Sequence, residues 1–245
     1  MLNDFYTHLG PIICVWLASF LQSVTGFGLV VVAAPLLMFF YDAKLTIVLM
    51  LILAACGNAA QSILLRRDAQ YRTVGELILG SWLGQPIGFF IYSLFPADNL
   101  KLLVSTAVII SLLLMQLSKR RIEECRRNTF ICGLLSGIMA MTTGMAGPPL
   151  AMYFAYTAME PRVQRATLVT FFCISNISSV ITFLLGGVDP SPALAEIRYL
   201  LPALAVGILC GHLSFRYVPA KLFRNLIFAI LYFTCLYTIF TVLRG

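Results

Sequence analysis

The sequence contains very few charged residues. Asp, Glu, Lys and Arg make up 11% of the 245 residues, 60% are hydrophobic, and the mean hydropathy is +0.92. Soluble domains carry about 25% charged and about 45–50% apolar residues. A water-soluble fold cannot cover so much apolar surface, which excludes a soluble enzyme or a nucleic-acid-binding protein. We therefore expect an all-α, polytopic integral membrane protein with room for roughly ten crossings.

Known cysteine motifs are also absent. The seven cysteines form no C-x-x-C pair and no Cys/His cluster at zinc spacing. Most of them lie in apolar runs, where a cysteine is usually a small buried hydrophobe. We expect no metal and no cofactor. The first ten residues lack a basic segment and a cleavage site, so the first apolar run is predicted to be a retained span.

Runs without charge mark the predicted spans, and two of them are too long for one helix. The runs cover residues 5–41, 45–65, 77–97, 102–118, 128–159, 166–188, 199–215 and 225–243. Six have the length of a single crossing, about 30 Å at 1.5 Å per residue. The runs 5–41 and 128–159 both contain Gly and Pro clusters near their middle. Broken helices are the natural inference, because irregular backbone at membrane depth occurs where it lines a cavity.

The distribution of basic residues supports this interpretation. If each long run turns back at its glycines, ten segments result, and one side of the membrane collects 13 of the 17 Lys and Arg residues. The positive-inside rule makes that side cytoplasmic. The cytoplasmic set is Arg66, Arg67, Arg72, Lys119, Arg120, Arg121, Arg126, Arg127, Arg162, Arg165, Arg216, Lys221 and Arg224. Both termini are then predicted to be periplasmic or extracellular, and Cys125 to be a reduced cytosolic thiol.

The two halves of the chain resemble each other. A shift of 118 residues superposes Cys14 on Cys132, Thr25 on Thr143, Gly26 on Gly144, and Asn58 on Asn176. We predict two repeats of about five helical segments, residues 1–118 and 129–245, joined by a cytoplasmic connector at 119–128. Because five is odd, the second repeat is inverted, an architecture typical of secondary transporters.

The two breaks predict an anion site. Thr25 and Thr143 are favourable N-cap residues, and the apolar runs 29–40 and 149–158 are expected to be half-helices that begin there. Pro148 suits a first helical turn. Two helix N-termini facing each other at the membrane centre favour a negative charge without any Lys or Arg. The candidate residues at the breaks are Thr25, Gly26, Phe27, Gly28, Thr143, Gly144, Ala146, Gly147 and Pro148.

Polar residues inside the predicted spans complete the candidate site. Asn58 and Asn176 occupy matching positions, and their amides are suited to donate to an oxyanion; the alternative role is to join membrane helices. Gln61 lies nearly one turn after Asn58, while Gln22 and Gln85 are weaker candidates. All the acids lie at segment ends or in loops. His212 is a candidate for proton coupling, and the alternative is a neutral, hydrogen-bonded histidine.

The residues at both breaks resemble those of the sulfite exporter TauE/SafE family of membrane transporters. The resemblance rests on the stretch 22–28 followed by Pro35, on 144–150, and on Arg165-Ala166-Thr167-Leu168 with Asn176 downstream. It implies outward movement of sulfite, sulfonates or related sulfur oxyanions across a bacterial inner (plasma) membrane. Leu29-Val30 replace a longer glycine run of many relatives, which bears on substrate identity.

Other functions stay open. The partners we expect are a small anionic substrate and the lipid bilayer, with no nucleic acid, in a monomer or homodimer. An enzyme would need a nucleophile–base pair, a metal cluster or an intramembrane acid pair, and the sequence contains none. A transporter or channel for another small anion, such as a carboxylate, is the alternative to a sulfur-oxyanion carrier.

Overall fold

The computed structural model describes residues 2–25, 29–117, 125–155, 157, 159–214, 232, 235–236 and 238–240. In these residues the protein has no strand, and the expected all-α fold is confirmed. Most of the predicted tenth segment, residues 225–243, and most of the connector lie outside the described residues. The helices are α1 (Leu2–Thr25), α2 (Leu29–Leu37), α3 (Ala43–Leu65), α4 (Tyr71–Leu94), α5 (Ala97–Leu117), α6 (Arg126–Thr143), α7 (Gly147–Ala155), α8 (Pro161–Leu185) and α9 (Ser191–Ser214).

The outer surface of the bundle is apolar, as a lipid-facing surface must be. Large hydrophobic side chains such as Leu83, Phe90 and Leu213 are exposed. Four helices among the described residues are long and apolar enough to cross a membrane: Ala43–Leu65, Tyr71–Leu94, Arg162–Leu185 and Ser191–Gly211. The protein is therefore a multi-pass membrane protein, as the composition indicates.

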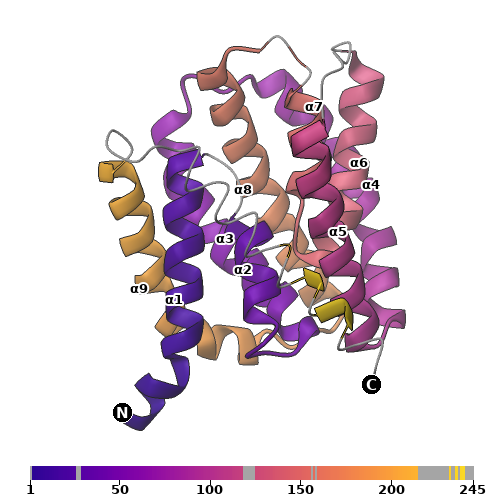
Figure 1. Ribbon diagram of the computed structural model, residues 1–245. Helices are drawn as coiled ribbons and strands as arrows, with labels where there is room; N and C mark the ends of the chain where they lie inside the picture. The colour runs from indigo at the N-terminus through magenta and orange to yellow at the C-terminus, as the bar shows by residue number, and fades with distance from the viewer. Residues whose placement is uncertain are drawn as a thin grey trace.

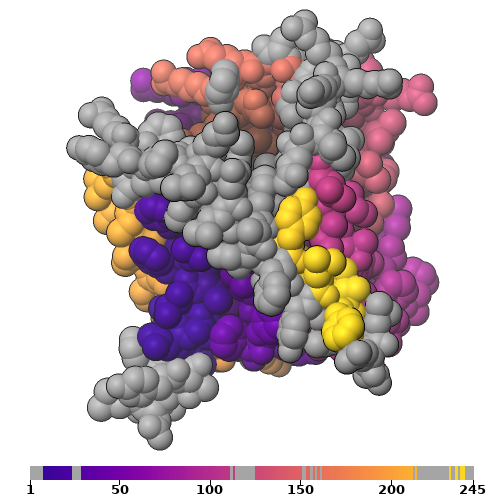
Figure 2. All heavy atoms as spheres, viewed as in Figure 1, coloured from indigo at the N-terminus to yellow at the C-terminus, as the bar shows by residue number. Residues whose placement is uncertain are grey.

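The helices pack in three pairs (Figure 1). α1 packs against α9, α4 against α6, and α3 against α8, with the last pair between the other two. The pattern of pairs is symmetric between the first four helices, α1–α4, and the four helices α6–α9. When each helix is replaced by its counterpart in the other set, the α1–α9 pair becomes the α6–α4 pair, and the α3–α8 pair becomes itself. The nine-residue helices α2 and α7 take the second place in each set. In the space-filling view, α1 and the described residues near the C-terminus appear on one face (Figure 2).

Glycines allow two of these pairs to approach closely. A Cβ at Gly84 or Gly88 would lie under 3.0 Å from atoms of α6, and one at Gly137 would do so against Ser81 of α4. Glycine at these positions therefore lets the backbones of α4 and α6 approach closely. Gly207 and Gly211 meet α1 in the same way, and they follow Gly84 and Gly88 by 123 residues.

Candidate functional site

The second predicted break is present between α6 and α7. α6 ends at Thr143, and Gly144 follows with φ of +73°, a left-handed conformation that glycine adopts without steric cost. The Gly144 N–H donates to the Ala140 carbonyl over 3.0 Å, which closes the last turn of α6. α7 then begins at Gly147, with Pro148 in the first turn, where no N–H partner is needed.

Thr143 stabilises this break from the side of α6. Its hydroxyl donates to the Met139 carbonyl over 2.7 Å and accepts from the Met145 N–H over 3.3 Å. The expectation that Thr143 caps α7 is wrong, because α7 starts four residues further on. These two backbone hydrogen bonds let the hydroxyl hold the turn that leads into α7.

The first break has the corresponding position in the chain. α1 ends at Thr25 and α2 begins at Leu29, in contact with α1. Gly26, Phe27 and Gly28 lie outside the described residues, as does the side chain of Thr25. The half-helices are shorter than expected: α2 ends at Leu37 instead of 40, and α7 at Ala155 instead of 158.

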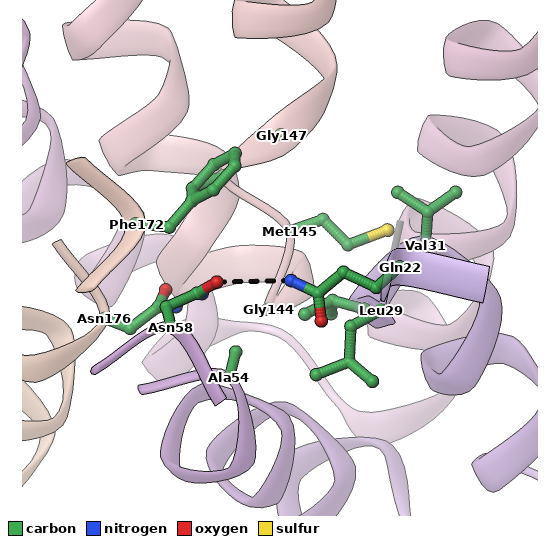
Figure 3. A pocket seen from close by; sticks show the side chains of 12 residues that line it. Gln22, Leu29, Val31, Ala54, Asn58, Gly144, Met145, Gly147, Phe172 and Asn176 are labelled. Carbon is green, nitrogen blue, oxygen red and sulfur yellow. Dashed lines mark hydrogen bonds between the residues drawn. The ribbon is translucent and has the colours of Figure 1, made fainter. Parts of the chain in front are cut away.

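The starts of α2 and α7 line one small cavity (Figure 3). Its volume is about 40 Å³. The first N–H groups of a helix have no partner within the helix, and both helix dipoles place their positive ends here. No charged residue is among the described residues that line the cavity. The lining residues are Gln22, Leu29, Val30, Val31, Ala54, Asn58, Gly144, Met145, Ala146, Gly147, Phe172 and Asn176.

Three buried amides supply the polar side chains of the cavity. Gln22, Asn58 and Asn176 come from α1, α3 and α8 and are 6%, 2% and 3% exposed. The Gln22 amide donates from Nε2 to Asn58 Oδ1 over 3.2 Å (Figure 3). Gln22 Oε1 is buried without a hydrogen-bond partner. A polar atom left in this state costs about 1–3 kcal/mol, so the site is incomplete without a ligand or solvent.

Other candidate residues lie away from the cavity lining. Gln61 is buried, and its amide donates to the Gly57 carbonyl of its own helix over 3.4 Å. Pro148 is buried beside the lining residue Gly147. His212 lies near the end of α9, and its side chain lies outside the described ones. The structure thus brings together Asn58, Asn176 and the 144–147 segment.

Most of the apolar residues of the lining were not among the predicted site residues. Phe172 precedes Asn176 by four residues, and Ala54 precedes Asn58 by four. Residues four apart share one face of a helix. This spacing is the signal that would have placed Phe172 and Ala54 at the site once the asparagines were chosen.

Gln85, a weaker candidate, belongs to a separate polar cluster between α4 and α8. Its Nε2 donates to Ser178 Oγ over 2.8 Å and to the Ser175 carbonyl over 3.3 Å, and its Oε1 accepts from Thr182 over 3.2 Å. Both ends of this amide are paired within the protein. The cluster therefore joins two helices, which is the alternative role for a buried membrane amide.

A cluster of ionisable side chains lies at the start of α9. Glu196 lies 3.1 Å from His8 Nδ1 and accepts from the Tyr41 hydroxyl over 2.7 Å, and the His8 ring stacks on Tyr199 with 4.4 Å between centroids. Burial, and then the hydrogen bond to Glu196 and its charge, raise the pKa of Tyr41 above its ordinary range. The cluster ties α1 and the loop after α2 to α9.

These features define a class first: a multi-pass membrane protein whose broken helices line a small cavity with three buried amides and no formal charge among its described residues. Comparison then gives the family. A family model described as Sulfite exporter TauE/SafE matches residues 12–238, and the chain belongs to this family of membrane transporters. No curated protein and no solved structure matches the chain.

Proposed function

We propose that the protein is a secondary transporter that moves small sulfur-containing oxyanions, such as sulfite, outward across a bacterial inner membrane. The observation that carries this proposal is the cavity where the first turns of α2 and α7 meet Gln22, a buried amide with an unpaired oxygen. Helix N-termini favour anions, and the buried polar side chain aimed into the cavity indicates a ligand.

The cavity volume limits the cargo in the state described. A water molecule needs about 10–15 Å³ of cavity volume. The cavity, with about 40 Å³, therefore holds roughly three or four water-sized groups. Sulfite has one sulfur and three oxygen atoms. A larger sulfonate would need the cavity to widen, whereas acetate has a similar size and is separated from sulfite only by experiment.

The helix pairs support an alternating-access mechanism. Close backbone contact through glycine makes α1·α9 and α4·α6 suitable rigid units, and α3·α8 lies between them. We propose that residues 1–118 and 129–245 are inverted repeats and that the two outer pairs rock about α3 and α8. This motion would open the cavity to each side in turn. We assign both termini to the periplasmic side and keep His212 as the candidate for proton coupling.

Transport into proteoliposomes tests this function. The purified full chain is reconstituted, and sulfite flux is measured against defined internal anions. We expect saturable flux and counterflow. Asn58→Ala and Asn176→Ala should each weaken apparent affinity about tenfold, the effect of losing one hydrogen bond of about 1.4 kcal/mol to the anion. Ser105→Ala is the matched control, because Ser105 is buried on α5 outside the cavity lining, with an unpaired hydroxyl.

Three outcomes would contradict the proposal. Sulfite that neither moves nor competes removes the substrate assignment. If acetate is transported and sulfite is not, the substrate class is carboxylates. Flux that does not saturate and shows no counterflow indicates a channel.

A further inference from the structure

The unpaired oxygen of Gln22 bears on the protonation state of the cargo. A side-chain carbonyl oxygen only accepts hydrogen bonds. Gln22 Oε1 is buried at the cavity and receives no hydrogen from any described residue. An anion with acceptor oxygens alone would place negative charge against this oxygen. An anion that carries one O–H group would instead donate to it.

The orientation of the two amides decides which group faces the anion. In the structure, Gln22 Nε2 donates to Asn58 Oδ1, which leaves Gln22 Oε1 as the unpaired atom. If nitrogen and oxygen were exchanged in both amides, the bond would be kept in the opposite direction and Gln22 Nε2 would face the anion as a donor. A dianion would then be accepted as well, so the pH dependence measured below distinguishes the two orientations.

The charge of the cavity gives an independent argument. Each helix N-terminus is equivalent to roughly +0.5 elementary charge, so α2 and α7 together supply about one positive charge. Within the described part of the chain, the cavity lining contains no Lys, Arg, Asp or Glu. One negative charge is therefore the most that the two N-termini balance, and the C-terminal ends of α1 and α6, which lie at the same breaks, reduce this positive charge further. A dianion would retain an uncompensated charge away from water.

We propose that the site binds its oxyanion as a singly charged, singly protonated species, with the O–H group donating to Gln22 and the other oxygens facing the N–H groups of α2 and α7. For sulfite this species is hydrogensulfite, not the dianion. The inference rests on the proposed function, and it adds Gln22 as the residue that selects the protonation state.

No described titratable side chain is among the lining residues of the cavity, and the side chain of His212 is not described. The described titratable side chains of α1, α3, α8 and α9 all lie outside the lining: His8, Cys14, Lys44, Cys56, Arg162, Arg165, Cys173, Glu196, Arg198, Tyr199 and Cys210. Because His212 is the candidate for proton coupling, pH dependence by itself does not identify the anion as the titrating group. A sulfite affinity that changes with pH while chlorate affinity stays constant would report the titration of the anion.

The test compares sulfite with chlorate, a pyramidal anion of the same atom count that has one charge and no O–H group at any working pH. Apparent affinity is measured by counterflow in proteoliposomes of the full chain, from mildly acidic to mildly alkaline pH. For total sulfite it should fall as the hydrogensulfite fraction falls. For chlorate it should stay constant and be about tenfold weaker than for hydrogensulfite, the effect of leaving one buried acceptor unpaired.

A variant assigns the effect to Gln22. Gln22→Met keeps the length of the side chain and removes the acceptor together with the donor to Asn58, so it should reduce the ratio of hydrogensulfite affinity to chlorate affinity. Sulfite affinity that stays constant or rises with pH overturns the inference and leaves the proposed function standing. Absence of sulfite binding at every pH overturns both. A Gln22→Met protein that keeps the full preference for hydrogensulfite also contradicts the inference.

Discussion

Gly144 is the position where the break can be tested most directly. Its φ of +73° lies in the left-handed region, where a residue with a Cβ loses about 1–2 kcal/mol. Space is not the difficulty, because an added Cβ would lie 3.6 Å from Ile47 and from Val30, which is ordinary contact. Gly144→Ala should therefore lower the free energy of unfolding by about 1–2 kcal/mol through backbone strain alone.

The same substitution should also weaken anion binding. Relief of the strain would rotate the backbone that leads to Ala146 and Gly147, two residues of the cavity lining. A loss of one well-directed N–H contact corresponds to about tenfold in affinity. Gly144→Asn should restore much of both properties, because asparagine tolerates the left-handed region better than alanine.

Gly187 provides the matched control. It also has a positive φ, +79°, with no atom within 4 Å of an added Cβ, and it lies in the loop between α8 and α9. Gly187→Ala should cost the same stability and leave sulfite affinity unchanged. Thermal unfolding in detergent and counterflow in proteoliposomes measure the two effects. Equal losses of affinity in both variants, or no loss of stability in Gly144→Ala, would refute the reasoning.

Three further predictions concern helix packing, the second polar cluster and orientation. Gly84→Val should prevent folding or lower the melting temperature strongly, because a Cβ at this position meets the backbone of α6 at Leu134, which cannot move aside as a flexible side chain does. The control is Gly75→Ala, which should not destabilise the protein because the space around Gly75 is open. Equal stability of the two variants would contradict the described packing of α4 against α6. Gln85→Leu should cost about 1 kcal/mol because Ser178 Oγ and the Ser175 carbonyl lose the Nε2 donor, while Thr182 still donates to the Ser178 carbonyl. Sulfite affinity should stay unchanged, and a selective loss of affinity would place Gln85 in the site. Cys125 is exposed next to α6, so an impermeant thiol reagent should label it in inverted membrane vesicles and not in intact cells, and the reverse result would overturn the proposed orientation.

Much of the fold could be predicted because the membrane limits the alternatives. Uncharged runs of one crossing length became α3, α4, α8 and α9, and the glycines of the run 128–159 separated α6 from α7. The 118-residue shift predicted that Asn58 and Asn176 occupy equivalent positions in the two halves of the chain, and both residues line the cavity. The helix ends were less accurate, since α2 and α7 stop before the apolar runs do.

The role of individual polar side chains could not be predicted in the same way. Gln22 and Gln85 are both amides inside apolar runs, and both were weaker candidates for the site. The structure gives Gln85 partners for its oxygen and its nitrogen, and leaves Gln22 Oε1 with none. Thr143 was expected to cap α7 and instead holds the end of α6. These differences depend on which neighbouring helix faces each side chain.

By itself, the sequence determined that the chain lies in a membrane, where its helices run, and where one of them breaks, because hydropathy, charge and glycine act locally along the chain. The tertiary structure alone decided that the first turns of α2 and α7 line one cavity and that Gln22, Asn58 and Asn176 line it with them. The physical reason is that hydrogen-bond satisfaction and the addition of two helix dipoles depend on distances between segments far apart in the chain.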